Sequence, residues 1–165
     1  MSLQREVELQ QRLHHPNIVE VFEVFESDEY LHLVMQRSWG GTLANMLKRE
    51  RRLTPRVAAT LLKQLLRALV YLHAQGVLHC DIKPENVLLD VVQDELGTAK
   101  PMDTGGRCTV KDAARLRMRL CDFGLARQVP QARYFKHSGS VHLVPFNGLS
   151  GTPGYISPEQ LLHKP

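Results

Sequence analysis

Cysteine is scarce in this sequence, and long apolar runs are missing from it. The 165 residues contain three cysteines, Cys80, Cys108 and Cys121, and no Cys-x-x-Cys pair. This excludes a disulfide-rich scaffold and argues against a structural zinc site. No apolar run approaches the roughly 18 residues of a membrane-spanning helix, and the first residues lack the apolar core of a signal peptide. These absences predict a cytoplasmic or nuclear protein without a membrane partner.

A large excess of one charge is also missing. Lys and Arg number 21 against 17 Asp and Glu, a net charge of +4, which is too small to predict a nucleic-acid partner. Two stretches depart from this balance. Residues 125–158 contain no Asp or Glu, which hints at an acidic protein substrate or an autoinhibitory contact. The basic run 48–52 has two interpretations, a solvated helix end, which is the simpler, or a phosphate-binding role.

The apolar periodicity predicts a mixed chain of helices and short strands. Helices are expected over 5–13, 42–49 and 54–76, where Thr42 and Thr54 are candidate N-caps. A hairpin is expected over 18–25 and 30–35, and short strands over 77–78, 87–89 and 116–121. The helix expected over 54–76 carries an apolar stripe, whose residues are predicted to be buried in the core. The stripe consists of Ala58, Leu61, Leu62, Leu65, Leu66, Leu69 and Leu72. Residues 92–114 are predicted to be a surface insertion.

Three short motifs, taken in order, carry the chemistry of the chain. They are His79-Cys80-Asp81-Ile82-Lys83-Pro84-Glu85-Asn86, Asp122-Phe123-Gly124 and Gly151-Thr152-Pro153-Gly154-Tyr155-Ile156-Ser157-Pro158-Glu159. A lone Asp-Phe-Gly carries little information. Together the motifs resemble the eukaryotic protein kinase family, whose catalytic loop, metal-binding triplet and end-of-loop motif follow in this order.

The resemblance implies roles for five residues in phosphoryl transfer from Mg-ATP. Asp81 would accept or orient the proton of the substrate hydroxyl, and Lys83 would reach the γ-phosphate. Asn86 and Asp122 would hold Mg²⁺, a hard cation that prefers oxygen ligands. Thr152 would support Asp81 and Lys83 from the substrate-binding loop.

Two neighbours of these residues have predicted roles that involve no ligand. The resemblance implies that His79 supports the backbone and binds no metal. Cys121 is predicted to be a buried small side chain, with a reactive thiol as the alternative.

The resemblance extends upstream to the nucleotide pocket. Glu6, nine residues before His15, falls where the family has its αC glutamate. Its alternative is a solvated helix face, since no partner lysine is present. Met35, Gln36 and Ser38 resemble the gatekeeper and hinge that line the adenine pocket.

The form of the loops indicates a subgroup. Lysine two residues after Asp81 is the serine/threonine-kinase form, and the motifs together resemble the calcium/calmodulin-dependent group, protein kinase D especially. Cys80 stands where most kinases carry an arginine that pairs with a phosphorylated loop residue. Gly148 stands where many relatives carry that phosphoacceptor. We therefore hypothesise that ordering of the loop does not depend on phosphate there, with Ser138, Ser140 and Ser150 as the alternative acceptors.

The predicted fold class is α+β, a truncated protein kinase-like fold. Residues 1–35 would be an N-lobe remnant with the αC helix and a hairpin, 36–41 the hinge, and 42–165 part of the C-lobe. The C-lobe part contains the insertion at about 92–114 and an activation segment over 122–159. No glycine-rich loop or Val-Ala-x-Lys strand precedes Glu6, and only residues 160–165 follow Glu159. The isolated chain is therefore expected to be marginally stable or prone to aggregation.

Two functions from different classes fit these observations. The first is the central portion of an ATP-dependent serine/threonine protein kinase, which transfers the γ-phosphate of Mg-ATP to protein hydroxyls; without the glycine-rich loop and its lysine, these 165 residues alone are expected to have little activity. The second is a catalytically incomplete, kinase-like chain that works as a docking module. Retention of both Asp81 and Asp122 favours the first, since non-catalytic relatives commonly lose one of them.

Overall fold

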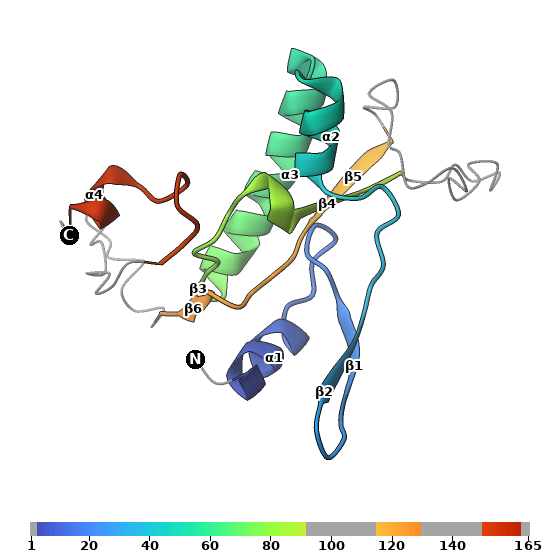
Figure 1. Ribbon diagram of the computed structural model, residues 1–165, viewed down its shortest axis with the longest axis vertical. Coiled ribbons are helices and arrows are strands. Elements are labelled where there is room, and N and C mark those ends of the chain that lie inside the picture. Colours follow the sequence, from blue (N-terminus) through green and yellow to red (C-terminus); the bar gives the residue numbers. More distant parts are fainter. Residues whose placement is uncertain (1–2, 92–114, 130–149, 163–165) are drawn as a thin grey trace.

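A computed structural model describes residues 3–91, 115–129 and 150–162 (Figure 1). The helices are α1 (Leu3–Gln11), α2 (Leu43–Glu50), α3 (Pro55–Ala74), the 3-10 turn η1 (Pro84–Asn86) and α4 (Pro158–Leu161). Thr42 Oγ1 accepts a hydrogen bond from the backbone N–H of Asn45 at 3.1 Å, and Thr54 Oγ1 accepts one from Val57 at 3.4 Å. Both threonines are N-caps, so the predicted starts of α2 and α3 are confirmed.

The strands pair into small antiparallel sheets. They are β1 (Val21–Glu26), β2 (Leu31–Met35), β3 (Val77–Leu78), β4 (Val87–Val91), β5 (Leu116–Leu120) and β6 (Arg127–Gln128). Among the described residues β1 pairs with β2, β3 with β6, and β4 with β5. The first five strands confirm the predicted hairpin and short strands. β6 lies in the stretch 125–158, where we predicted no strand, and it forms because its backbone pairs with β3.

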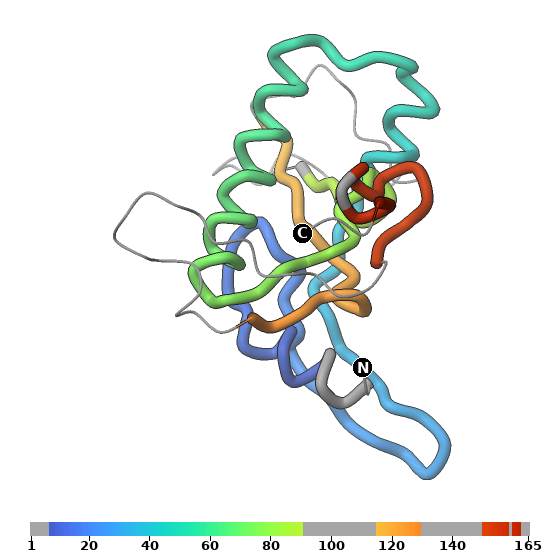
Figure 2. Tube along the Cα trace, turned by 90° about the vertical axis from the view of Figure 1, so that its left-hand side faces the viewer, coloured from blue at the N-terminus to red at the C-terminus, as the bar shows by residue number. Residues whose placement is uncertain are grey.

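The core lies where α3 packs on β5. Leu72, Leu89, Met118, Leu120 and Phe123 are fully buried there. The turn that follows α1 joins this core through the backbone of Leu120, whose N–H donates to the carbonyl of Asn17 at 2.8 Å. Figures 1 and 2 show the result: α1 and the β1–β2 hairpin lie at one end of the molecule, and the α2–α3 turn lies at the other.

The apolar stripe of α3 is only partly core, which corrects the prediction. Leu61 is 4% exposed, whereas Leu62 and Leu66 are 55% and 51% exposed, and Ala58 is also exposed. The stripe is wider than the arc of the helix that contacts β5, so its outer residues remain uncovered. No helix in the described part of the chain is long and apolar enough to cross a membrane. The predicted insertion at 92–114 and most of 125–158 lie outside the described residues.

Candidate active site

The catalytic-loop motif begins directly after β3 and is held by the His79 ring. Cys80 has a φ of +64°, a left-handed conformation that is rare for a residue other than glycine, and it turns the chain between His79 and Asp81. His79 Nδ1 accepts the backbone N–H of Asp81 at 3.2 Å, so its Nε2–H is the donor to the carbonyl of Cys121 at 3.0 Å. The ring also contacts Phe123 edge to face at 4.9 Å.

The environment of His79 keeps its ring neutral. Burial lowers the pKa of His79, although the hydrogen bond to Cys121 and the nearby carboxylates oppose that shift. A neutral ring can accept at one nitrogen and donate at the other, as both contacts require. His79 therefore supports the backbone of the two neighbouring motifs, as predicted.

Asp81 is the centre of the polar cluster, and it is only 6% exposed. Its Oδ2 accepts hydrogen bonds from Lys83 Nζ at 2.7 Å and from Asn86 Nδ2 at 3.0 Å. Its Oδ1 accepts from the backbone N–H of Thr152 at 3.0 Å and from the Thr152 hydroxyl at 2.7 Å. The hydroxyl oxygen of Thr152 in turn accepts from Lys83 Nζ at 2.6 Å. Four of the residues predicted from the motifs are therefore in direct contact.

These contacts fix the protonation states of Asp81 and Lys83. Burial disfavours the charged form of Asp81, but the hydrogen bonds from Lys83, Thr152 and Asn86, with the charge of Lys83, hold its pKa below the ordinary value. The hydrogen bond to Asp81 raises the pKa of Lys83. The site is thus a carboxylate–ammonium pair, in which Asp81 is a weak base well suited to orienting a hydroxyl group.

Asn86 and Asp122 supply oxygen atoms beside this cluster. The Asn86 amide nitrogen donates to the carbonyl and to Oδ2 of Asp81, at 2.9 and 3.0 Å, which leaves its Oδ1 as the atom available to a ligand. Asp122 is exposed and has a φ of +65°, and its Oδ1 accepts the backbone N–H of Gly124 at 3.3 Å. A neutral and an anionic oxygen donor fit the preference of Mg²⁺. The described residues contain no cluster of three His, Cys, Asp or Glu side chains that could hold a metal.

The two described cysteines of the site are not activated thiols. Burial, with the charge of Asp122, raises the pKa of Cys121 to about 11, and its thiol donates to the carbonyl of Asn86 at 3.3 Å. Cys121 is therefore protonated at neutral pH and packs as a small side chain. Burial also raises the pKa of Cys80, while the charge of Arg127 acts in the opposite direction. Arg127, in β6, thus places a positive charge near Cys80, the position where most kinases carry an arginine. This charge was not predicted from the sequence.

The residues predicted to line the adenine pocket lie at the end of β2 and in the segment that leads to α2. Met35 ends β2 and is 47% exposed, and the backbone N–H of Gln36 donates to the carbonyl of Glu20 at 2.8 Å. Ser38 Oγ accepts a hydrogen bond from Arg119 Nη1 at 3.3 Å. Glu6 lies in α1, but its side chain is outside the described residues.

An ion pair next to the hinge, with Arg119 buried and Asp90 partly exposed, was not predicted. Arg119 is 6% exposed, and its Nη1 donates to Asp90 Oδ2 at 2.8 Å. Charged and apolar residues alternate along 116–120, which places Arg117 and Arg119 on the same face of β5. This alternation could have predicted that the two arginines share a face. The partner acid depends on the register, in which Asp90 lies opposite Arg117.

Comparison with known proteins gives a uniform result. The model of the protein kinase domain matches residues 1–165. The chain is 31% identical over 164 residues to calcium/calmodulin-dependent protein kinase type 1 of Macrobrachium nipponense, covering 99% of this chain and 38% of that protein. It is 35% identical over 161 residues to serine/threonine-protein kinase cds1 of Schizosaccharomyces pombe, covering 98% of this chain and 28% of that protein. It is 35% identical over 164 residues to human serine/threonine-protein kinase D3, covering 99% of this chain and 15% of that protein. The chain spans less than half the length of each of these relatives.

Proposed function

The chain belongs to the protein kinase family, and on this premise we propose that it carries the catalytic centre of a serine/threonine protein kinase. The centre would transfer the γ-phosphate of Mg-ATP to a serine or threonine hydroxyl of a protein substrate. One observation carries the proposal: the Asp81 carboxylate is bonded to Lys83, Asn86 and Thr152 in a single buried cluster. An isolated aspartate in a turn would need none of these partners.

The hydrogen bonds of Asp81 suggest how a substrate hydroxyl gains access to it. A carboxylate offers about four acceptor positions, and four donor groups already occupy them: Lys83 Nζ, Asn86 Nδ2, the Thr152 N–H and the Thr152 hydroxyl. An incoming hydroxyl therefore has to displace one donor. Lys83 has the longest and most flexible side chain of the three residues, and its ammonium can bind a phosphate oxygen as a point charge. Movement of Lys83 to the γ-phosphate would free Oδ2 for the substrate.

The transfer step then needs little covalent chemistry from the protein. The substrate oxygen forms a bond to the γ-phosphorus while the bond from that phosphorus to the bridging oxygen of ADP breaks, and the hydroxyl proton passes to Asp81 late in the step. Because its pKa is lowered, Asp81 mainly orients the hydroxyl. Asn86 and Asp122 would hold Mg²⁺, which neutralises charge on the phosphates when bound.

We also propose the division into lobes that the motifs predict. Residues 1–35 would form the N-lobe part, 36–41 the hinge and 42–165 the C-lobe part. The separation of α1 and the hairpin from the α2–α3 turn in Figure 1 supports this division.

A phosphoryl-transfer assay tests the proposed function. The purified chain is incubated with Mg²⁺, radiolabelled ATP and a degenerate library of serine and threonine peptides. Asp81→Asn removes the charge that orients the hydroxyl, so turnover is expected to fall at least about a hundredfold. Asp28→Asn is the matched control, because Asp28 is exposed in the turn of the β1–β2 hairpin. Equal turnover by the parent chain and Asp81→Asn would refute the assigned role.

Nucleotide binding separates the enzyme from the docking module. A fluorescent ATP analogue is titrated with and without Mg²⁺ into the parent chain and into Asp122→Asn. The kinase proposal expects Mg²⁺-dependent binding that Asp122→Asn weakens, because this substitution removes the anionic ligand of the ion. A chain without nucleotide binding or turnover would instead fit the docking module.

A further inference from the structure

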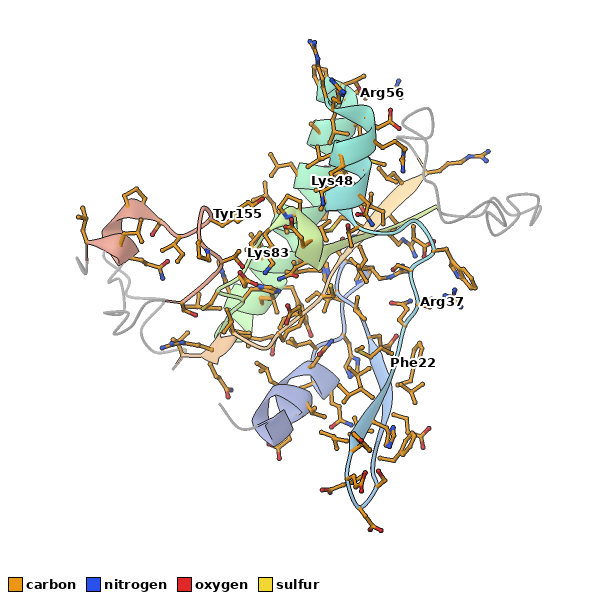
Figure 3. All side chains as sticks on the ribbon, in the orientation of Figure 1. Phe22, Arg37, Lys48, Arg56, Lys83 and Tyr155 are labelled. Atoms are coloured by element: carbon orange, nitrogen blue, oxygen red, sulfur yellow. The ribbon has the colours of Figure 1, made fainter. Side chains whose placement is uncertain are left out.

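The turn between α2 and α3 carries a concentration of positive charge that the catalytic centre does not use. We call it the basic tip, and it consists of Lys48, Arg49, Arg51, Arg52 and Arg56. The single acid within it, Glu50, pairs with Arg49 at 3.0 Å. In the described part of the chain, no ion pair neutralises the other four cations. Figure 3 shows Arg56 at the end of the α2–α3 pair and Lys48 between Arg56 and Lys83.

Two of these cations have an explanation in helix stability. Lys48 and Arg49 lie in the last turn of α2, where unsatisfied carbonyl groups and the helix dipole favour positive charge. Their presence therefore does not by itself indicate a partner.

The other arginines are not explained in this way, and two of them oppose the local backbone. Arg51 has a φ of +58° at the C-cap of α2, a left-handed position that glycine or asparagine occupies at lower cost. Arg56 lies in the first turn of α3, which contains no acid, although the N-terminus of a helix favours negative charge. Arg52 is exposed in the turn between them. Positions where local preferences are violated are commonly functional ones.

We propose that the basic tip is a docking surface for an acidic segment of a partner protein, with Arg51, Arg52 and Arg56 as the residues that bind its carboxylates. Charge complementarity carries this assignment. Guanidinium groups bind carboxylates with two parallel hydrogen bonds, so three exposed arginines fit a segment that presents about three acidic side chains.

The chemistry of the tip favours a protein segment over a membrane or a nucleic acid. Binding to a membrane surface needs an apolar face beside the charges. Leu53, the leucine of the turn, is packed against the core, and the exposed Leu62 and Leu66 lie farther along α3 than Arg56. Single-stranded nucleic acid is bound with the help of aromatic side chains that stack on bases. Residues 48–56 contain no aromatic residue.

A binding measurement with matched charge variants tests the proposal. The probe is a fluorescein-labelled peptide of twelve alternating Glu and Gly residues, titrated with the full 165-residue chain at low salt and followed by fluorescence anisotropy. A peptide with Gln in place of Glu is the probe control. The tip variant is Arg51→Asn, Arg52→Gln and Arg56→Gln. The control variant, Arg12→Gln, Lys63→Gln and Arg67→Gln, removes the same net charge from exposed positions elsewhere.

The expected result is saturable binding of the Glu peptide that weakens about tenfold in the tip variant and much less in the control variant, since three exposed ion pairs are lost. Higher salt should weaken binding by the parent chain. Absence of saturable binding to the Glu peptide would overturn the proposal. Equal weakening in both variants would overturn it too, because net charge would then explain the binding. Tip-dependent binding to phosphatidylserine vesicles or to single-stranded RNA, without binding to the peptide, would overturn the assignment to a protein segment.

Discussion

Thr152 binds the Asp81 carboxylate twice, through its backbone N–H at 3.0 Å and its hydroxyl at 2.7 Å, and both bonds end on Oδ1. The two residues are 71 positions apart in the sequence. The segment that precedes α4 is therefore tied to the catalytic loop through one carboxylate oxygen. Lys83 closes the arrangement, because its ammonium contacts both Asp81 Oδ2 and the Thr152 hydroxyl. A change at Thr152 should consequently affect Asp81 and Lys83 together.

Thr152→Val removes the hydroxyl and keeps the backbone N–H and the shape of the side chain. We expect kcat/KM for peptide phosphorylation to fall about tenfold or more, since a hydrogen bond to a charged group contributes about 1.5–3 kcal/mol. Loss of this donor also raises the pKa of Asp81, so the acid limb of the pH–rate profile should move to higher pH. Steady-state kinetics across a pH series measure both effects.

Thr152→Ser is the control for this variant, because serine retains the hydroxyl. Its kcat/KM and the acid limb of its pH profile should stay close to those of the parent chain. A Thr152→Val chain with an unshifted profile would show that the hydroxyl does not stabilise the Asp81 carboxylate.

Stability toward acid should depend on His79. Its folded-state pKa is lowered by burial, so the unfolded state binds a proton more readily than the folded state. The stabilisation is complete above the unfolded pKa of about 6.5 and is lost as the pH falls through the folded pKa. The free energy of unfolding should therefore decrease below about pH 6.5, with a smaller decrease in His79→Gln. Urea denaturation at a series of pH values measures the difference. The same pH dependence of the unfolding free energy in the parent chain and in His79→Gln would contradict a lowered pKa of His79.

Much of the fold could be predicted from local signals. The threonines before α2 and α3 cap those helices because a capping hydrogen bond involves residues only three positions apart, such as Thr42 and Asn45. The catalytic cluster was also predictable, but for another reason. The motifs that contain Asp81 and Thr152 resemble a family in which they meet, and neither periodicity nor composition could have brought them together.

The features that were missed depend on tertiary geometry. The exposure of Leu66 depends on which side of α3 packs on β5, and the Arg119–Asp90 pair depends on the register of β4 and β5. β6 exists because the chain after the Asp-Phe-Gly triplet returns to pair with β3. Residues 127–128 themselves carry no strand pattern.

The Arg119–Asp90 pair, in which Arg119 is buried, should show strong coupling. Asp90→Ala leaves the Arg119 guanidinium without a compensating carboxylate in a buried position, which is expected to cost about 3 kcal/mol of unfolding free energy. The double variant Asp90→Leu with Arg119→Leu should recover part of that loss, because no uncompensated charge remains. Urea denaturation of the two single variants and the double variant gives the coupling free energy. Additive losses would argue against a direct pair.

The two sides of α3 should respond differently to truncation. Leu61 is 4% exposed and Leu66 is 51% exposed. Leu61→Ala leaves a cavity in the core and should cost about 3 kcal/mol of unfolding free energy, whereas Leu66→Ala should change it by about 0.5 kcal/mol or less. Chemical denaturation of the two variants under one set of conditions provides the comparison. A large loss in Leu66→Ala would mean that this face is covered in solution.

Removing arginines from the basic tip should stabilise the chain. Arg51→Gly relieves the left-handed conformation at φ +58° and is expected to add about 1 kcal/mol to the free energy of unfolding. Arg56→Glu places a negative charge at the N-terminus of α3 and should add about 0.5 kcal/mol. Arg12→Gly and Arg67→Glu are the comparison substitutions, and neither position offers these gains. Chemical denaturation measures all four. Destabilisation by both Arg51→Gly and Arg56→Glu would mean that the arginines are retained for folding, which would remove the argument that their positions indicate a binding function.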